Sequence, residues 1–196
     1  MRLLLMYMFH LDIRILVDQL QTRLNLMIII QIKILTRINN YIMIIAKYIL
    51  ITIFTYAGME GVTWFVHKYV MHGFLWVLHK DHHQPRYQHV FEKNDTFFVI
   101  GAIPSIALFY FGVNPELNYK FFIGLGILFY GITYFMVHDV LIHQRFKWFK
   151  KTKNSYLIGL RKAHKIHHKH LGKEDGECFG MLNVPKKYFK KPFSVK

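Results

Sequence analysis

The segment that decides the fold reads HKYVMHGFLWVLHKDHH and runs from His67 to His83. Five histidines fall within these seventeen residues, spaced first as H-x4-H and then as H-x2-H-H. The same two spacings return in the same order in residues 138–143 and residues 164–168. A lone histidine is usually an ordinary core or surface residue, so it is the doubled pattern that predicts a common role for these side chains.

The repeated histidines predict a site for two metal ions. Imidazole is a good ligand for iron, copper, zinc and nickel, and ten ligands are too many for one ion. The predicted metal ligands are His67, His72, His79, His82, His83, His138, His143, His164, His167 and His168.

Helix geometry indicates how these ligands are shared between metals. Positions three or four apart lie on one helix face, so the histidines of each H-x2-H-H box can serve one metal or two neighbouring metals. Positions five apart on a regular α-helix are turned about 140° from each other. We therefore expect His67 and His72 to face different metals unless the helix is distorted, and we expect the same of His138 and His143.

Polar side chains near the boxes are candidates to orient the ligands. A histidine bound to a metal usually donates its other ring N–H to a carboxylate or a carbonyl group. Glu60 lies in an apolar helix, where a carboxylate is costly and therefore usually functional. The predicted supporting residues are Glu60, Asp81, Asn94, Asp95 and Asp139, and Glu92 is also near the boxes in sequence.

Composition points to a membrane protein. Hydrophobic residues make up 53% of the 196 residues, yet the formal net charge is +15. A basic nucleic-acid-binding protein is rejected, because here the Lys and Arg residues flank long apolar runs rather than lying on a polar scaffold. Basic residues at the ends of membrane spans account for both facts, and membrane lipid is the expected partner. The one cysteine, Cys178, excludes a cysteine-based metal cluster.

The chain is predicted to be all-α, an integral membrane bundle of three or four transmembrane helices. A long helix is expected from residue 41 to the first histidines, and further spans at residues 96–112 and 119–137. Residues 1–40 form an N-terminal extension, interpreted as an amphipathic helix on the membrane surface, with a poor fourth span as the alternative. The main domain is predicted at residues 41–190 and a basic tail at residues 191–196.

Charge predicts the orientation in the membrane. The turn at residues 113–118 contains no Lys or Arg, whereas the histidine boxes and most basic residues lie at the opposite ends of the spans. Cytoplasmic loops carry an excess of Lys and Arg, so we expect the metal site to face the cytoplasm. The basic N-terminal segment disagrees with this orientation if there are three spans, and a fourth span would resolve the conflict.

These motifs resemble the fatty acid hydroxylase superfamily, and within it they are similar to bacterial β-carotene 3-hydroxylases. The resemblance covers about residues 42–190, and its most specific part is the run YFMVHDVLIHQR from Tyr134 to Arg145. Other segments that carry it are Gly58–Glu60, His67–Gly73, Asn94–Asp95, Ala163–His168, Gly172–Glu174 and Phe179–Gly180.

The resemblance implies a non-haem di-iron monooxygenase in the bacterial inner membrane, with O2 as co-substrate. It would hydroxylate carbon 3 of the β-ionone ring and convert β-carotene through β-cryptoxanthin to zeaxanthin. The chain has no glycine-rich dinucleotide motif of its own. An electron donor protein, such as a ferredoxin with its NAD(P)H reductase, is therefore an expected partner.

Three alternatives stay open at this point. A sterol or fatty acyl hydroxylase of the same superfamily would carry the same boxes. A desaturase with this ligand type differs in the fate of a radical intermediate, which sequence does not reveal. A histidine-rich metal transporter is a more distant alternative, because its ligands would lie near the middle of the membrane rather than at the ends of spans.

Overall fold

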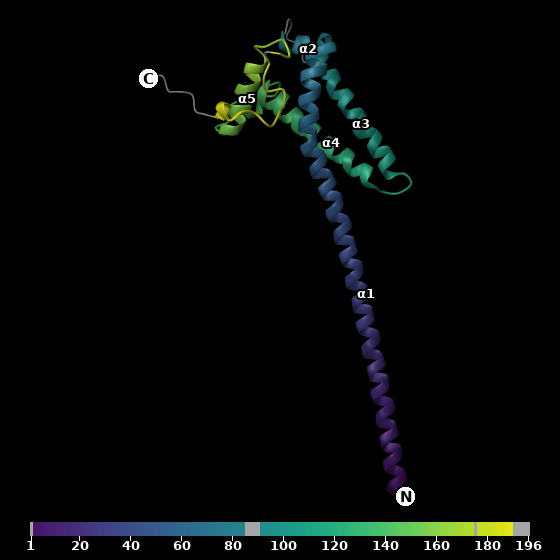
Figure 1. The fold of residues 1–196 in the computed structure, drawn as a ribbon. Coiled ribbons are helices and arrows are strands. Elements are labelled where there is room, and N and C mark those ends of the chain that lie inside the picture. The colour runs from purple at the N-terminus through teal and green to yellow at the C-terminus, as the bar shows by residue number, and fades with distance from the viewer. Residues whose placement is uncertain (1, 85–90, 175, 190–196) are drawn as a thin grey trace. The chain divides into compact units, whose positions relative to one another are not determined.

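The protein is all-α. The computed structural model describes residues 2–84, 91–174 and 176–189, without the side chains of residues 3–5, 7, 9, 11 and 147. These residues form helices and turns, and no strand occurs among them (Figure 1). The predicted basic tail at residues 191–196 lies outside the described residues. Contacts divide the chain into two units, Met1–Lys47 and Tyr48–Lys196.

The first helix is longer than the sequence suggests. Helix α1 covers Arg2–Phe65 and continues directly into the π-helical segment η1, Val66–Phe74. The described part of the extension, residues 2–40, is therefore helical without a break before residue 41, and its placement on or across the membrane stays a prediction. Gly73 leaves the helical conformation, and helix α2 then covers Trp76–His83.

Two further apolar helices form an antiparallel pair. The 3-10 turn η2, Lys93–Asp95, leads into α3, Thr96–Val113, and a short turn leads on to α4, Tyr119–Phe135. With the first helix, these are the three helices among the described residues that are long and apolar enough to cross a membrane, at Asp12–Phe74, Asp95–Val113 and Tyr119–Ile142. The three predicted spans are thereby confirmed as helices.

Small residues let these helices approach closely. The Ser105 hydroxyl of α3 donates to the Gly124 carbonyl of α4 at 2.8 Å. A side chain at Gly126 of α4 would clash with α1, because its Cβ would lie 2.6 Å from the Thr55 Cβ and 2.8 Å from the Thr52 carbonyl oxygen. Close contact through small residues is the usual way in which membrane helices associate.

The remaining elements gather at one end of the α3–α4 pair. Helix α4 runs on into the π-helical segment η3, Met136–Ile142, and after the short η4, Lys147–Phe149, helix α5 covers Ser155–His167. Within residues 48–196, α2 and α5 lie at the end of α3 and α4 that is opposite to their connecting turn (Figure 1). A small core formed by Leu141, Leu160, Ala163 and Val184 holds η3, α5 and the segment before η5, Lys186–Phe189, together.

Candidate metal centre

Two π-helical segments bring together the histidines that are spaced five residues apart. In a π-helix the backbone bonds connect residues i and i+5, which places those residues on one face. The His143 amide accordingly donates to the His138 carbonyl at 2.9 Å. His67 and His72 lie in one histidine group, and His138 and His143 lie in another. The exception that the prediction allowed, a distorted helix, applies to both pairs, because neither segment is a regular α-helix.

The first histidine group is built from three parts of the chain. It consists of His67, His72, His79, His83 and His167, which come from η1, α2 and α5. All five are buried, and His167 is completely inaccessible to solvent. Each offers a ring nitrogen within 4.8 Å of those of the other members, so the group could hold a metal ion.

The second histidine group lies beside the first. It consists of His82, His138, His143 and His164, from α2, η3 and α5, and it too could hold a metal ion. His168 lies between the groups: its Nε2 is 2.8 Å from the His164 Nε2, and its ring stacks on that of His83 with centroids 4.3 Å apart. The structure thus brings all ten predicted ligands into one cluster.

Each H-x2-H-H box is divided between the two groups. His79 and His83 are one helical turn apart and point into the first group, whereas His82 points into the second. In α5, His167 belongs to the first group and His164 to the second. Both helices therefore connect the two groups directly, which is the second of the two arrangements that the spacing allowed.

The ring nitrogens of the first group are oriented as metal ligands would be. The Nδ1 atoms of His67, His72 and His167 contact the carbonyl oxygens of Phe179, Leu171 and Glu177, each at 3.0 Å. A carbonyl oxygen only accepts, so Nδ1 carries the proton and Nε2 of each neutral ring presents its lone pair.

These lone pairs converge. The His67 Nε2 lies 3.1 Å from the Nε2 atoms of both His79 and His167, and the His72 Nε2 lies 3.2 Å from that of His167. Converging lone pairs repel each other unless a cation lies between them. Their spacing is close to the ~3 Å expected between neighbouring nitrogens that are each about 2.1 Å from one metal.

A different observation indicates that the second group fits metal binding. The Nε2 atoms of His82 and His138 are buried and have no hydrogen-bond partner. A buried polar atom without a partner costs free energy and is rare in native proteins. A metal ion between these rings removes that cost, so both groups fit metal binding.

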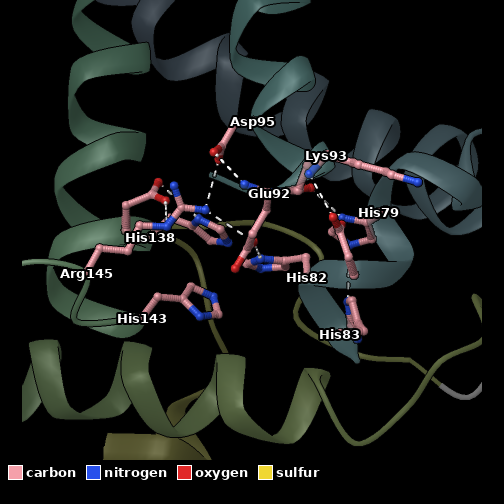
Figure 2. Close-up of polar contacts among 12 residues, drawn as sticks. His79, His82, His83, Glu92, Lys93, Asp95, His138, His143 and Arg145 are labelled. Atoms are coloured by element: carbon pink, nitrogen blue, oxygen red, sulfur yellow. Dashed lines mark hydrogen bonds and ion pairs between the residues drawn. The ribbon is translucent and has the colours of Figure 1, made fainter. Parts of the chain in front are cut away.

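Carboxylates support the second group (Figure 2). The Nδ1 of His82 lies 2.8 Å from the Glu92 Oε2, and the Nδ1 of His138 lies 3.2 Å from the Asp139 Oδ2. The Arg145 guanidinium forms ion pairs with Glu92 at 3.1 Å, with Asp139 at 3.1 Å and with Asp95 at 2.9 Å. Arg145 therefore holds both of the carboxylates, Glu92 and Asp139, that contact His82 and His138.

Four of the five predicted supporting residues lie near the histidines, in three different positions. Asn94 and Asp139 contact a histidine directly, and the Asn94 Oδ1 lies 2.6 Å from the His79 Nδ1. Asp95 lies one step further away, because it accepts from the Glu92 amide at 3.0 Å and pairs with Arg145. Asp81 of α2 accepts from the Lys93 amide of η2 at 2.7 Å and so links these two elements.

Glu60 acts on a segment of backbone rather than on a histidine ring. Its carboxylate accepts from the Tyr130 hydroxyl at 2.7 Å and from the amides of Leu182 and Asn183 at 2.8 Å each. These amides belong to residues 177–184, here called the C-terminal strap. The strap supplies the carbonyl groups of Glu177 and Phe179 that accept from two histidines, so Glu60 supports the first group indirectly.

Burial keeps His79, His167 and His168 neutral when no metal is bound. Burial, opposed by the hydrogen bond to Asn94, lowers the pKa of His79 to about 3. Burial and the neighbouring His72 lower the pKa of His167 to about 3. Burial, together with His138 and His72, lowers the pKa of His168 to about 4. Neutral imidazole is the form that binds a metal.

Sequence reasoning missed two kinds of support. The carbonyl groups of Leu171, Glu177 and Phe179 are backbone atoms, and no side-chain pattern marks them. Arg145 entered the sequence analysis only as the last residue of the run from Tyr134, but its side chain is 20% exposed and lies among three carboxylates. Its position two residues after His143 was the available signal.

Comparison with known proteins identifies the family. A family model described as fatty acid hydroxylase matches residues 52–185, which contain both histidine groups. The chain belongs to the fatty acid hydroxylase family. This confirms the resemblance predicted from the motifs.

Several curated proteins from the same family are similar to this chain. The β-carotene hydroxylase of Pantoea ananas is 43% identical over 136 residues, which cover 69% of this chain and 77% of the relative. That of Pseudescherichia vulneris is 41% identical over 137 residues, or 70% of this chain and 77% of the relative. The chloroplastic β-carotene 3-hydroxylase 2 of Arabidopsis thaliana is 38% identical over 132 residues, or 66% of this chain and 43% of the relative. No solved structure gives a match.

Proposed function

We propose that this protein is a β-carotene 3-hydroxylase, which converts β-carotene through β-cryptoxanthin to zeaxanthin. The observation that carries the proposal is the convergence of two buried histidine groups at one end of the apolar helices. The names of the similar proteins from Pantoea ananas and Pseudescherichia vulneris supply the substrate and the reaction type.

The two groups would each hold one iron ion. His67, His72, His79, His83 and His167 would bind the first ion, and His82, His138, His143 and His164 the second. His168 lies close enough to both groups to complete either one. With O2 as co-substrate, bound iron supplies the oxidising power that an unactivated C–H bond requires. This makes the protein a non-haem di-iron monooxygenase.

The protein's own contribution is to hold the ligands rigidly and to exclude water. Backbone carbonyls, Asn94, Glu92 and Asp139 fix which ring nitrogen faces the metal. The ligand candidates are buried or half-buried, which keeps bulk water from the reacting atoms. Exclusion of water prevents side reactions of a strong oxidant.

The location of the groups suits a long apolar substrate. They lie at the ends of helices whose outer faces expose large apolar side chains, such as Phe98, Ile103 and Ile106 of α3. A carotenoid is nearly as long as the ~30 Å hydrocarbon core of a bilayer. With the polyene along the helices, the β-ionone ring reaches the membrane surface, where the histidines are.

A sterol or fatty acyl hydroxylase or desaturase is the second candidate. The description of the family model, fatty acid hydroxylase, is the observation that favours it. These activities use the same ligand type and differ in the substrate that the apolar surface accepts. Product analysis separates them directly.

We place the protein in the bacterial inner membrane, with the metal site facing the cytoplasm. The turn between α3 and α4 carries Glu116 and no basic residue, whereas exposed lysines such as Lys150, Lys151 and Lys165 lie at the histidine end. Excess Lys and Arg marks the cytoplasmic side. An accessibility tag at Asn114 should report the far side of the membrane and a tag at Lys93 the cytoplasm, and the reverse result contradicts this orientation.

The electrons for O2 would come from a separate protein. A weakly bound acidic donor, such as a ferredoxin reduced by its NAD(P)H reductase, would be attracted to the basic residues beside the site. The exposed members of this face are Lys150, Lys151, Lys165 and Lys169. Arg145 is not part of it because of its ion pairs, and the side chain of Lys147 lies outside the described residues.

Product analysis in cells that synthesise β-carotene tests the function. Expression of this chain should produce zeaxanthin, and His143→Ala should abolish the product while leaving the protein in the membrane. Glu116→Gln in the far turn is the control, because it changes no predicted metal ligand and adds no basic residue to that turn, and it should retain product. Unchanged β-carotene with well-expressed protein contradicts the proposal, and hydroxylated sterol or fatty acid favours the second candidate.

A further inference from the structure

The two histidine groups differ in the charge of the atoms behind their ligands. In the first group, the Nδ1 atoms of three histidines face backbone carbonyl groups, and that of His79 faces the neutral amide of Asn94. In the second group, the Nδ1 atoms of His82 and His138 face the carboxylates of Glu92 and Asp139.

Arg145 ties these carboxylates together without cancelling their charge. Its guanidinium contacts Glu92 and Asp95 (Figure 2). It also contacts Asp139, so three carboxylates surround one cation. The cluster is partly shielded from water, with side-chain exposures of 24% for Glu92, 12% for Asp139 and 30% for Asp95. Net negative charge in a partly dehydrated site acts strongly on its neighbours.

The charge behind a ligand changes the metal that it binds. An imidazole that donates to a carboxylate is a more basic ligand than one that donates to a carbonyl group. A more basic ligand and nearby negative charge stabilise the higher oxidation state of a metal, and so lower its reduction potential. In the second group, the greater ligand basicity and the nearby negative charge both lower the reduction potential. In the first group, no carboxylate among the described residues contacts the Nδ1 atoms of these four histidines.

We propose that Glu92 and Asp139, held by Arg145, are positioning residues that make the two irons inequivalent. The second centre then has the lower reduction potential and is oxidised first. The proposal rests on the proposed function only in assuming that each group binds one iron. It deepens that function by assigning a different redox role to each centre.

Mössbauer spectroscopy of the full-length protein in detergent, loaded anaerobically with enriched Fe(II), measures the inequivalence. Two ferrous doublets of equal area are expected. Ferricyanide added at half an equivalent per iron takes one electron from each protein, and it should convert one ferrous doublet to ferric almost completely before the other changes. Loss of both doublets in parallel would overturn the proposal.

Isosteric variants assign the doublets. Glu92→Gln and Asp139→Asn should each shift the doublet that is oxidised first, and should reduce or abolish the order of oxidation. Asn94→Asp is the mirror variant, because it places a carboxylate behind His79 and should shift the other doublet instead. If Glu92→Gln and Asn94→Asp perturb the same doublet, or neither perturbs any, the assignment is wrong.

Two further outcomes are separable. If Glu92→Gln loses iron, Asn94→Asp still decides the question, since it leaves the carboxylates of the second group in place. A wild-type protein that binds no iron, or one iron, contradicts the proposed function itself. Two bound irons with a single unresolved doublet and parallel oxidation contradict only the present inference.

Discussion

Glu60 offers a sharp test of how a residue remote from the histidines supports them. Its carboxylate accepts from the amides of Leu182 and Asn183, both at 2.8 Å, and from the Tyr130 hydroxyl at 2.7 Å. Glu60→Ala removes all three acceptor contacts at once. The C-terminal strap then loses its attachment to α1, while every histidine remains in the sequence.

The magnitude follows from the two amide contacts. A hydrogen bond to a charged group contributes about 1.5 kcal/mol or more, so the two that hold the strap contribute about 3 kcal/mol. Each 1.4 kcal/mol is about a tenfold change in an equilibrium constant. Local opening of the strap should therefore become about 100-fold more frequent in Glu60→Ala.

Hydrogen exchange followed by mass spectrometry measures this opening on a peptide that covers residues 178–184. Exchange should accelerate about 100-fold there, and iron loss to a chelator should accelerate too, because the strap carbonyls orient His67 and His167. Glu116→Gln in the exposed α3–α4 turn is the control and should change neither rate. Unchanged exchange in the strap with Glu60→Ala would refute the reasoning.

Three further predictions concern packing, pH and the electron donor. Gly126→Val should lower the melting temperature, since its side chain clashes with two threonines of α1 and overpacking costs about 1–3 kcal/mol, whereas Gly131→Ala, with nothing within 4 Å, should be nearly neutral. The metal-free protein should lose stability as pH falls below about 6.5, because burial lowers the pKa of His79 to about 3 and only the unfolded chain then takes up the proton; an equal melting temperature at pH 7 and pH 5 would argue against this. Donor-limited turnover should fall with rising salt and in Lys150→Glu/Lys151→Glu, with no change in iron content, whereas the control Lys150→Arg/Lys151→Arg should keep its rate. If neither salt nor charge reversal changes the rate, the basic face binds lipid alone.

The sequence predicted the membrane helices well because their signal is local. Runs such as Thr96–Val113 are apolar throughout, and the turn residues between the spans separate them clearly. At the histidines of η1 and η3, local patterns left open whether the helix is regular or distorted. Regular α-helical geometry turns His138 away from His143, and only the observed π-helical bonding reverses that result.

The supporting contacts were predicted only in part, for a physical reason. Asn94 and Asp139 are polar side chains close to the boxes in sequence, so proximity was a useful guide. Glu60 was noticed because a carboxylate in an apolar helix is costly, but its partners are Tyr130 of α4 and two amides of the strap that lie more than a hundred residues away in sequence. Long-range backbone contacts of this kind depend on the tertiary fold, which local patterns do not contain.

Metal analysis of the purified full-length protein tests the central claim most directly. After anaerobic loading with Fe(II), the wild type should retain about two irons per chain, one for each histidine group. His67→Ala in the first group and His138→Ala in the second should each reduce the content toward one. A single iron in the wild type, or two irons retained when both histidines are replaced together, would contradict the assignment of two adjacent centres.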